Sequence, residues 1–248
     1  MAIKDTEGKV YPSLGALWDA ELGTDRSKQD KWYSAGASYW KGVDGTVDGM
    51  LGGLAFVSPA DIQGSIKTLT DLVRKGMSRT TCLDCGAGIG RVSQEVLARV
   101  FRQVDLLEQD QAFVDRAREE LAGNAQIRHF FAVGMQSFLW KDPLSPADGL
   151  QYDCVWIQWV IGHLTDEDLI QFLRNARSSL TPGGYIVIKD NVCHEGYLLD
   201  VEDHSLMRTL EAVISLCDKS GLMVFSAEKQ TYFPSTIFPV YTIVLKVD

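Results

Sequence analysis

Three glycines in one short loop are the residues of this sequence whose spacing points most directly to a bound ligand. The run Asp84-Cys85-Gly86-Ala87-Gly88-Ile89-Gly90-Arg91 follows an apolar segment, residues 80–85, and opens a helix-like pattern. Glycine permits a tight turn and lets backbone N–H groups approach a ligand closely. A dinucleotide-binding loop reads G-x-G-x-x-G, whereas here the third glycine comes one residue earlier and Arg91 stands where the last glycine would be. The spacing therefore favours a cofactor site of another kind.

Three further features lie where such a site would need polar groups. Glu108 ends the next strand, 18 residues after Gly90, where a carboxylate can accept hydrogen bonds from both hydroxyls of a ribose; taken alone, it reads equally well as a solvated strand end. Gly134-Met135-Gln136 follows the third strand, and Arg91 can pair with a carboxylate through its planar fork. The pattern acid-x-G-x-G-x-G resembles the first motif of class I methyltransferases. That resemblance implies S-adenosyl-L-methionine as the cofactor, with the groups after the third strand near its adenine.

The fourth strand ends in a run of aromatic and polar residues, WIQWVIGHL (156–164). Ligands bind at the carboxyl ends of strands in open α/β sheets, so this run is expected to deliver reactive groups. Strict alternation places Gln158 and Val160 on one side and Trp159 on the other. Many small-molecule and nucleic-acid methyltransferases have N/D-P-P-Y/F at this place. Its absence disfavours methylation of the amino group of a nucleobase.

The elements that must position these residues alternate between strand and helix. Helices are expected within 12–23, near 30–41, and at 58–75, 91–101, 110–122, 165–180 and 203–221, and strands at 80–85, 104–108, 127–133, 152–160, 185–192, 222–230 and 239–247. Ser58 should cap the helix that begins there, and Pro182-Gly183-Gly184 should form a turn before the fifth of these strands. Such alternation builds crossover units and a parallel sheet. The predicted fold class is α/β, a Rossmann-like, doubly wound and mostly parallel seven-stranded sheet with an N-terminal helical extension.

Composition and charge limit the kinds of binding partner and cell compartment that fit this protein. The 248 residues carry a net charge of −9, which disfavours a sequence-independent grip on nucleic acid. No stretch approaches the roughly 20 apolar residues that span a bilayer, and the first ten residues lack a secretory signal pattern. Five scattered cysteines, including a C-x-x-C at Cys82 and Cys85, indicate reduced structural thiols rather than a metal site. We expect a monomeric protein of the cytosol or nucleus without bound metal.

Four segments, taken together, give a more specific resemblance. TVDGMLGG (46–53), LDCGAGIGR (83–91), WIQWVIGHLTD (156–166) and IVIKDN (186–191) closely match the protein N-terminal methyltransferases, over roughly residues 31–247. Enzymes of this family methylate the α-amine of chains that begin X-Pro-Lys once the initiator Met is removed. The family usually has Asp where this chain has Glu108. The resemblance divides the chain into an N-terminal extension and substrate-channel segment, 1–57, and a methyltransferase domain, 58–248.

By this resemblance, each candidate site residue receives a role. The cofactor would be held by Gly86, Arg91, Glu108, Gln109, Met135, Gln136 and Gln158. The substrate would be bound by Trp40, Trp159, Asn191, Asp200 and Ser205, with Asp203 and His163 assisting the reaction. Asp200 is assigned to the third-position Lys of the substrate. If a helix has begun by Asp200, it and Asp203 would face one side as paired carboxylates.

The chemistry of the acceptor supports a role for these polar groups. A free α-amine has a pKa of about 7.7–8.0 and is largely ammonium at neutral pH, without a lone pair to attack a methyl group. Transfer therefore needs a group that removes or relays a proton, and Asp203 and His163 are candidates. Asn191 can hydrogen-bond the first residue's carbonyl, and Trp40 and Trp159 can wall the channel by stacking or by a cation–π contact.

Other interpretations stay open from the residues alone. The segment LDVEDHS (199–205) also fits an acidic helix start, and His163 also fits a cap of the following helix. A small-molecule N- or O-methyltransferase on the same fold is the alternative enzyme. A peptide-binding pseudoenzyme that retains the cofactor is the alternative from another class.

Overall fold

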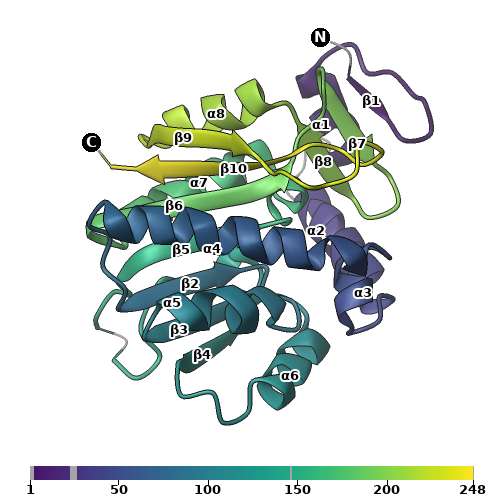
Figure 1. Ribbon diagram of the computed structural model, residues 1–248. Coiled ribbons are helices and arrows are strands. Elements are labelled where there is room, and N and C mark those ends of the chain that lie inside the picture. Colours follow the sequence, from purple (N-terminus) through teal and green to yellow (C-terminus); the bar gives the residue numbers. More distant parts are fainter. Residues whose placement is uncertain (1–2, 23–26, 146, 248) are drawn as a thin grey trace.

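A twisted sheet forms the centre of the protein in the computed structural model, which describes residues 3–22, 27–145 and 147–247 (Figure 1). Its seven strands lie in the order β4-β3-β2-β5-β6-β10-β9. Their bounds are β2 Thr81–Cys85, β3 Gln103–Glu108, β4 Ile127–Ala132, β5 Tyr152–Gln158, β6 Leu180–Asn191, β9 Met223–Lys229 and β10 Val240–Lys246. Neighbouring strands from β4 to β6 are parallel, and β10 is antiparallel to both β6 and β9. The predicted fold class is confirmed.

Helices cover both faces of this sheet because successive strand residues point to opposite sides. On β5, Cys154 and Trp156 face the cluster that includes helix α4 (Ser58–Arg74), whereas Val155 and Ile157 face the cluster formed with α7 (Asp166–Ser178) and α8 (Leu210–Lys219). Helix α6 (Gln111–Glu120) joins the α4 side. The helix after the glycine loop contains a π-helical segment, Ser93–Leu97, before α5 (Ala98–Val100). Within the described ranges, none of the helices combines the length and the hydrophobicity of a membrane span.

The N-terminal elements gather at one end of the sheet, beyond the carboxyl ends of the parallel strands (Figure 1). They are β1 Ile3–Asp5, α1 Leu14–Leu22, α2 Ser27–Lys41 and α3 Val47–Met50. β1 belongs to a second, three-stranded sheet of order β1-β7-β8, with β7 at Tyr197–Asp200 and β8 at Ser205–Arg208. The short helix within 12–23 and the helix near 30–41 are confirmed, whereas this small sheet was not predicted.

The predicted helix over 203–221 is wrong in its first third. Ser205–Arg208 is a strand, β8, that pairs antiparallel with β7, and the helix begins only at Leu210, where the Thr209 hydroxyl accepts a hydrogen bond from the Ala212 N–H. Asp200 and Asp203 therefore do not share a helix face. They lie at the end of β7 and in the turn of a β-hairpin.

Three local predictions also need correction. Ser58 does not cap α4, since Val57 precedes the helix without a side-chain cap and the Ser58 hydroxyl accepts a hydrogen bond from Arg91 instead. Pro182–Gly184 is not a turn before a strand but lies inside β6, where the register with β5 shifts. Alternation does not continue past Gln158, because β5 ends there and Trp159 has a left-handed φ of 53°.

Candidate cofactor and acceptor sites

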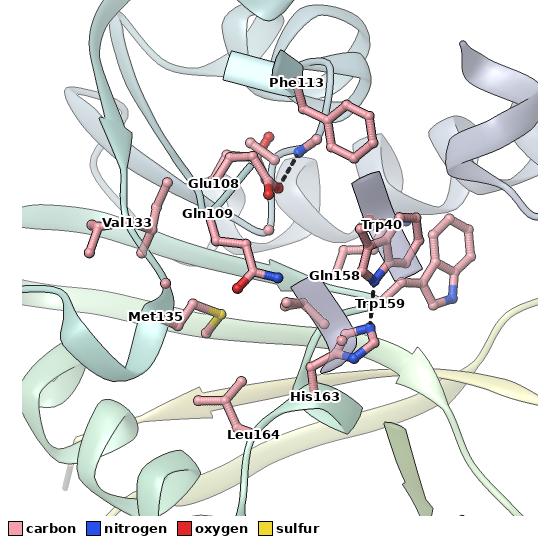
Figure 2. Close-up of a pocket in the computed structure, with 18 of the residues that line it drawn as sticks. Trp40, Glu108, Gln109, Phe113, Val133, Met135, Gln158, Trp159, His163 and Leu164 are labelled. Carbon is pink, nitrogen blue, oxygen red and sulfur yellow. Dashed lines mark hydrogen bonds between the residues drawn. The ribbon is translucent and has the colours of Figure 1, made fainter. Parts of the chain in front are cut away.

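One cavity lies at the carboxyl ends of the central parallel strands and collects the residues predicted to bind the cofactor. Figure 2 shows several of them, with Glu108 and Gln109 on one wall and Met135 on another. The predicted cofactor residues that line this cavity are Gly86, Arg91, Glu108, Gln109, Met135, Gln136 and Gln158. The structure thus brings together all seven, from four separate segments of the chain.

The glycine loop is shaped by close approach of neighbouring side chains. Gly86 and Gly88 both have positive φ, and a Cβ at either would come within 2.8 Å of Val160 or of the Met50 sulfur. The Gly88 N–H donates to Glu108 Oε2 at 2.9 Å (Figure 2). The Asp110 N–H donates to Oε1 at 2.9 Å. Burial raises the pKa of Glu108, and these N–H donors oppose the rise. Each carboxylate oxygen keeps a further lone pair for a ligand hydroxyl.

Asp61, which the sequence did not single out, organises the charged floor of this cavity. Its fully buried carboxylate contacts Arg91 Nη2 at 2.8 Å and Lys189 Nζ at 2.6 Å, and it accepts a hydrogen bond from Gln158 Nε2 at 2.9 Å. Gln158 Oε1 in turn accepts the Trp156 indole N–H at 3.0 Å. The cluster holds two cations against one carboxylate, so it carries an excess positive charge.

These residues fit S-adenosyl-L-methionine, whose methionine part bears a carboxylate and whose ribose bears two hydroxyls. The excess positive charge at Arg91 and Lys189 suits the carboxylate, although Lys189 itself is buried beneath the cavity rather than lining it. The free lone pairs of Glu108 suit the hydroxyls. The first acid of the loop, Asp84, is buried, and its Oδ2 accepts a hydrogen bond from the Ser93 hydroxyl at 2.6 Å. Burial raises the pKa of Asp84 to about 7. Asp84 therefore supports the loop as a partly protonated group and is not a fixed counter-charge to the cofactor.

A second cavity adjoins the first and collects the residues predicted to bind the acceptor. Predicted residues that line it are Trp40, Trp159, His163, Asn191, Asp203 and Ser205. Asp200 does not line it, but its charge lies close enough to raise the pKa of Asp203. Four side chains line both cavities and form the wall between them, namely Trp40, Met50, Trp159 and His163.

Asp203 lines this second cavity, and one of its carboxylate oxygens has no hydrogen bond within the described residues. Its Oδ1 is buried and has no hydrogen-bond partner among residues 3–22, 27–145 and 147–247. Burial raises the pKa of Asp203, and Ser205 and His163 oppose the rise. A buried, unpaired carboxylate oxygen is costly unless a ligand satisfies it. A bound ammonium group or N–H donor would do so.

The His163 imidazole is held by both of its nitrogens. Nε2 lies 3.0 Å from the Trp40 indole nitrogen, and because an indole N–H only donates, Nε2 must be the unprotonated nitrogen (Figure 2). The proton then resides on Nδ1, which faces the His204 carbonyl at 3.3 Å. Burial lowers the pKa of His163, so the ring is neutral near pH 7. Its lone pair becomes available to a substrate only when Trp40 releases it.

Trp40→Phe is expected to raise the pKa of His163. The indole N–H can donate only to the neutral imidazole, so this bond stabilises the neutral form. Loss of a hydrogen bond worth about 1 kcal/mol should raise the pKa of His163 by about half a unit to one unit. Ring-proton NMR during a pH titration would measure the pKa. Tyr39→Phe, on the same helix, is the matched control and should leave it unchanged. An unchanged value in Trp40→Phe would show that the bond is not formed in solution.

Asp190 explains how the strained end of β5 is held. Its Oδ2 accepts the N–H groups of Val160 and Ile161, each at 3.1 Å, directly after the left-handed Trp159. A tryptophan at positive φ costs energy and persists only where its surroundings fix it. Burial raises the pKa of Asp190 to about 6. This carboxylate, adjacent to Asn191, thereby places Trp159 in the wall between the cavities.

The strand order, the glycine loop and the cavity at the carboxyl ends of β2 and β5, where the strand order reverses, define a class I S-adenosylmethionine-dependent methyltransferase. The family model described as AdoMet dependent proline di-methyltransferase matches residues 28–246, and the chain belongs to this family.

Named relatives agree with this assignment. The chain is 42% identical over 250 residues to alpha N-terminal protein methyltransferase 1 of Dictyostelium discoideum, covering 98% of this chain and 90% of the relative. It is 41% identical over 222 residues to the human N-terminal Xaa-Pro-Lys N-methyltransferase 1, covering 88% and 96%. Among solved structures, a SAM-dependent methyltransferase from Leishmania major superposes with a TM-score of 0.90 at 35% identity, covering 99% and 96%.

Sequence reasoning missed several residues of the site. Asp61 lies outside the motifs, and Asp190 lies within IVIKDN but received no role. Trp32, Tyr33 and His204, which also received no role, line the first cavity. Both Trp32 and Tyr33 lie on α2. The Trp32 indole N–H donates to the His163 carbonyl, and the Tyr33 hydroxyl donates to the Asp168 carboxylate. Over the described ranges, no cluster of three or more His, Cys, Asp or Glu is placed to hold a metal ion.

Proposed function

We propose that this protein transfers methyl groups from S-adenosyl-L-methionine to the α-amine of protein N-termini that begin Xaa-Pro-Lys. Family membership establishes methyl transfer from this cofactor. The names of the human and Dictyostelium relatives support the acceptor, since both specify protein N-termini. The observation that carries the proposal is the unpaired Asp203 oxygen in a cavity that shares Trp40, Trp159 and His163 with the cofactor cavity.

In this proposal the chain's own residues bind the amine, orient it and remove its proton. The bound cofactor supplies an electrophilic methyl group on sulfur. Asp203 Oδ1 accepts a hydrogen bond from the ammonium and then its proton, because burial gives this carboxylate a raised pKa. His163, once freed from Trp40, is a second acceptor for that proton. Trp40 and Trp159 exclude water and restrict the amine to a line toward the cofactor cavity.

The remaining residues would read the peptide. Asn191 lines the acceptor cavity and can donate its side-chain N–H to the first carbonyl of the substrate. That donor matters because a second-position Pro has no N–H to anchor the chain by. Asp200 adds negative charge beside Asp203 and suits a third-position Lys. Ser205 stabilises the charged form of Asp203 by hydrogen bonding.

A peptide test separates this acceptor from the alternatives. The free peptide Ser-Pro-Lys-Arg is expected to gain mass in steps of one methyl group, and the same peptide acetylated at its N-terminus to gain none. Mass spectrometry after incubation with the cofactor measures both. Methylation of the acetylated peptide would assign the acceptor to another group, and cofactor binding without turnover of either peptide would favour a pseudoenzyme.

We also propose a reducing compartment, the cytosol or nucleus, as the place of action. All five cysteines are free and buried, and such thiols suit reducing conditions. Microscopy of the fluorescently tagged full chain, in its own host cells, tests this location.

A further inference from the structure

The segment 3–22, which lies before the residues matched by the family model, adds a strand to the hairpin that carries the acceptor residues. β1 pairs in parallel with β7, with Ile3 opposite Tyr197 and Asp5 opposite Leu199. The Thr6 N–H then donates to the Leu199 carbonyl at 2.9 Å, and its hydroxyl accepts the Val201 N–H at 3.3 Å. Backbone bonds from the N-terminal segment thus continue to the point where β7 gives way to the turn.

The same segment also supplies the core under this hairpin. Ile3, Tyr11 and Leu17 form one buried apolar cluster with Leu199 of β7 and Leu206 of β8. Leu17 is 0% exposed although it belongs to a short helix at the edge of the molecule. The hairpin has no apolar partner of comparable size on this side other than α2, whose Trp32 completes the cluster among the described residues.

A second route joins the segment to the imidazole. The Trp18 ring meets the Trp32 ring edge-on at 5.3 Å, and the Trp32 indole N–H donates to the His163 carbonyl at 2.8 Å. Trp32 also lies edge-on to His204, at 6.0 Å. The N-terminal segment therefore supports His163 as well as the hairpin.

The hairpin needs such support because its turn is strained where the acceptor residues lie. His204, between Asp203 and Ser205, has a left-handed φ of 53°. Its carbonyl accepts the bond from His163 Nδ1, so the strained residue ties the turn to the imidazole. Non-glycine residues keep such a conformation only when the surrounding contacts fix it.

We propose that residues 3–22 are a positioning element of the acceptor site, which holds Asp203, Ser205 and His163 in place for the peptide. None of residues 3–22 lines either cavity, so the segment acts through the hairpin and Trp32. None of the seven residues assigned to the cofactor belongs to the apolar cluster under the hairpin, so cofactor affinity is expected to change little. The acceptor in this inference is the one given under the proposed function, so the test below includes a readout that does not depend on turnover.

Leu17→Ala in the full chain tests this role. The matched control is Leu173→Ala, an identical change at another 0% exposed leucine, which belongs to α7 and packs in a different cluster. Both variants should lower the melting temperature by similar amounts. Only Leu17→Ala should reduce kcat/KM for the Xaa-Pro-Lys peptide, by about tenfold or more and chiefly through KM, with S-adenosylhomocysteine affinity within twofold of wild type. Leu17→Met, which conserves volume, should restore the peptide KM.

Hydrogen exchange of the amides of residues 197–208 provides the independent readout. Exchange should be faster in Leu17→Ala and unchanged in Leu173→Ala, whether or not the peptide is the acceptor. Deletion of residues 2–22 should give the same loss of peptide affinity with cofactor affinity retained. Equal effects of the two leucine variants on peptide KM and on hairpin exchange, or full peptide turnover by the deletion variant, would overturn the proposal.

Discussion

Asp203→Asn is expected to reduce kcat for a Xaa-Pro-Lys peptide by about 10²- to 10⁴-fold, the range that general base catalysis contributes. The amide cannot take the proton of the ammonium, and it places an N–H₂ group or a weaker acceptor where the unpaired Oδ1 now lies. Affinity for S-adenosylhomocysteine should stay within twofold, because Asp203 lines only the acceptor cavity. Steady-state turnover by mass spectrometry and calorimetric titration of the product measure the two quantities.

The pH profile gives this prediction a control within the same variant. In the wild type, activity should fall as pH is lowered, because the amine and Asp203 both take up protons. In Asp203→Asn the carboxylate no longer titrates, whereas the free amine still does, with a pKa of about 7.7–8.0, so the residual rate should rise most steeply between pH 7 and pH 9. A variant rate within threefold of wild type at pH 7 would remove Asp203 as the base and leave His163.

Asp61→Asn is expected to have the largest effect on stability. Removing this carboxylate leaves Arg91 and Lys189, which are 7% and 0% exposed in their side chains, as buried cations without their counter-charge. Breaking a buried pair in this way typically costs about 3–5 kcal/mol. Cofactor affinity should fall as well, because Arg91 loses the partner that aims it. Chemical denaturation and titration with S-adenosylhomocysteine measure the two losses.

The same helix provides the matched control. Asp71→Asn removes a carboxylate from α4 that is 41% exposed and pairs with Lys67 and Arg74 at 3.3 and 3.4 Å. Exposed pairs of this kind contribute about 0–1 kcal/mol, so stability should hardly change.

The stability loss of Asp61→Asn should also depend on pH. Burial already lowers the pKa of Lys189 and the Asp61 carboxylate opposes this, so the pKa of Lys189 falls further in Asp61→Asn. The unfolded state then binds more protons, and the stability deficit should shrink as pH rises from 7 to 10. A deficit that grows with pH would contradict this account.

The main sheet could be predicted from the sequence because each strand is a short apolar run between turn residues. The hairpin of β7 and β8 could not. Leu206, Leu210 and Val213 continue a helical spacing into the true helix α8, so periodicity alone extends that helix backward. What makes Ser205–Arg208 a strand is its pairing with β7, and β7 pairs with β1 from nearly 200 residues earlier. Contacts of that range leave no local pattern.

The candidate site divides in the same way. Gly86 and Glu108 could be predicted from the glycine loop and the strand that follows it, and Asn191 from the family resemblance. All three line one of the two cavities. Asp61 was not found, since an acid in the first turn of a helix is the ordinary complement to the helix dipole. Only the fold shows that its side chain is buried under Arg91. The bond between Trp40 and His163 joins residues 123 apart and has no sequence signal either.

The partition of Trp40, Met50, Trp159 and His163 has a consequence for how the two molecules meet. These four side chains line both cavities, so a ligand that fixes their positions in one cavity changes the surface of the other cavity. Donor and acceptor are thereby energetically linked, and thermodynamics requires that the linkage be equal in both directions. The factor by which bound S-adenosyl-L-methionine changes the affinity for the peptide equals the factor by which bound peptide changes the affinity for S-adenosyl-L-methionine.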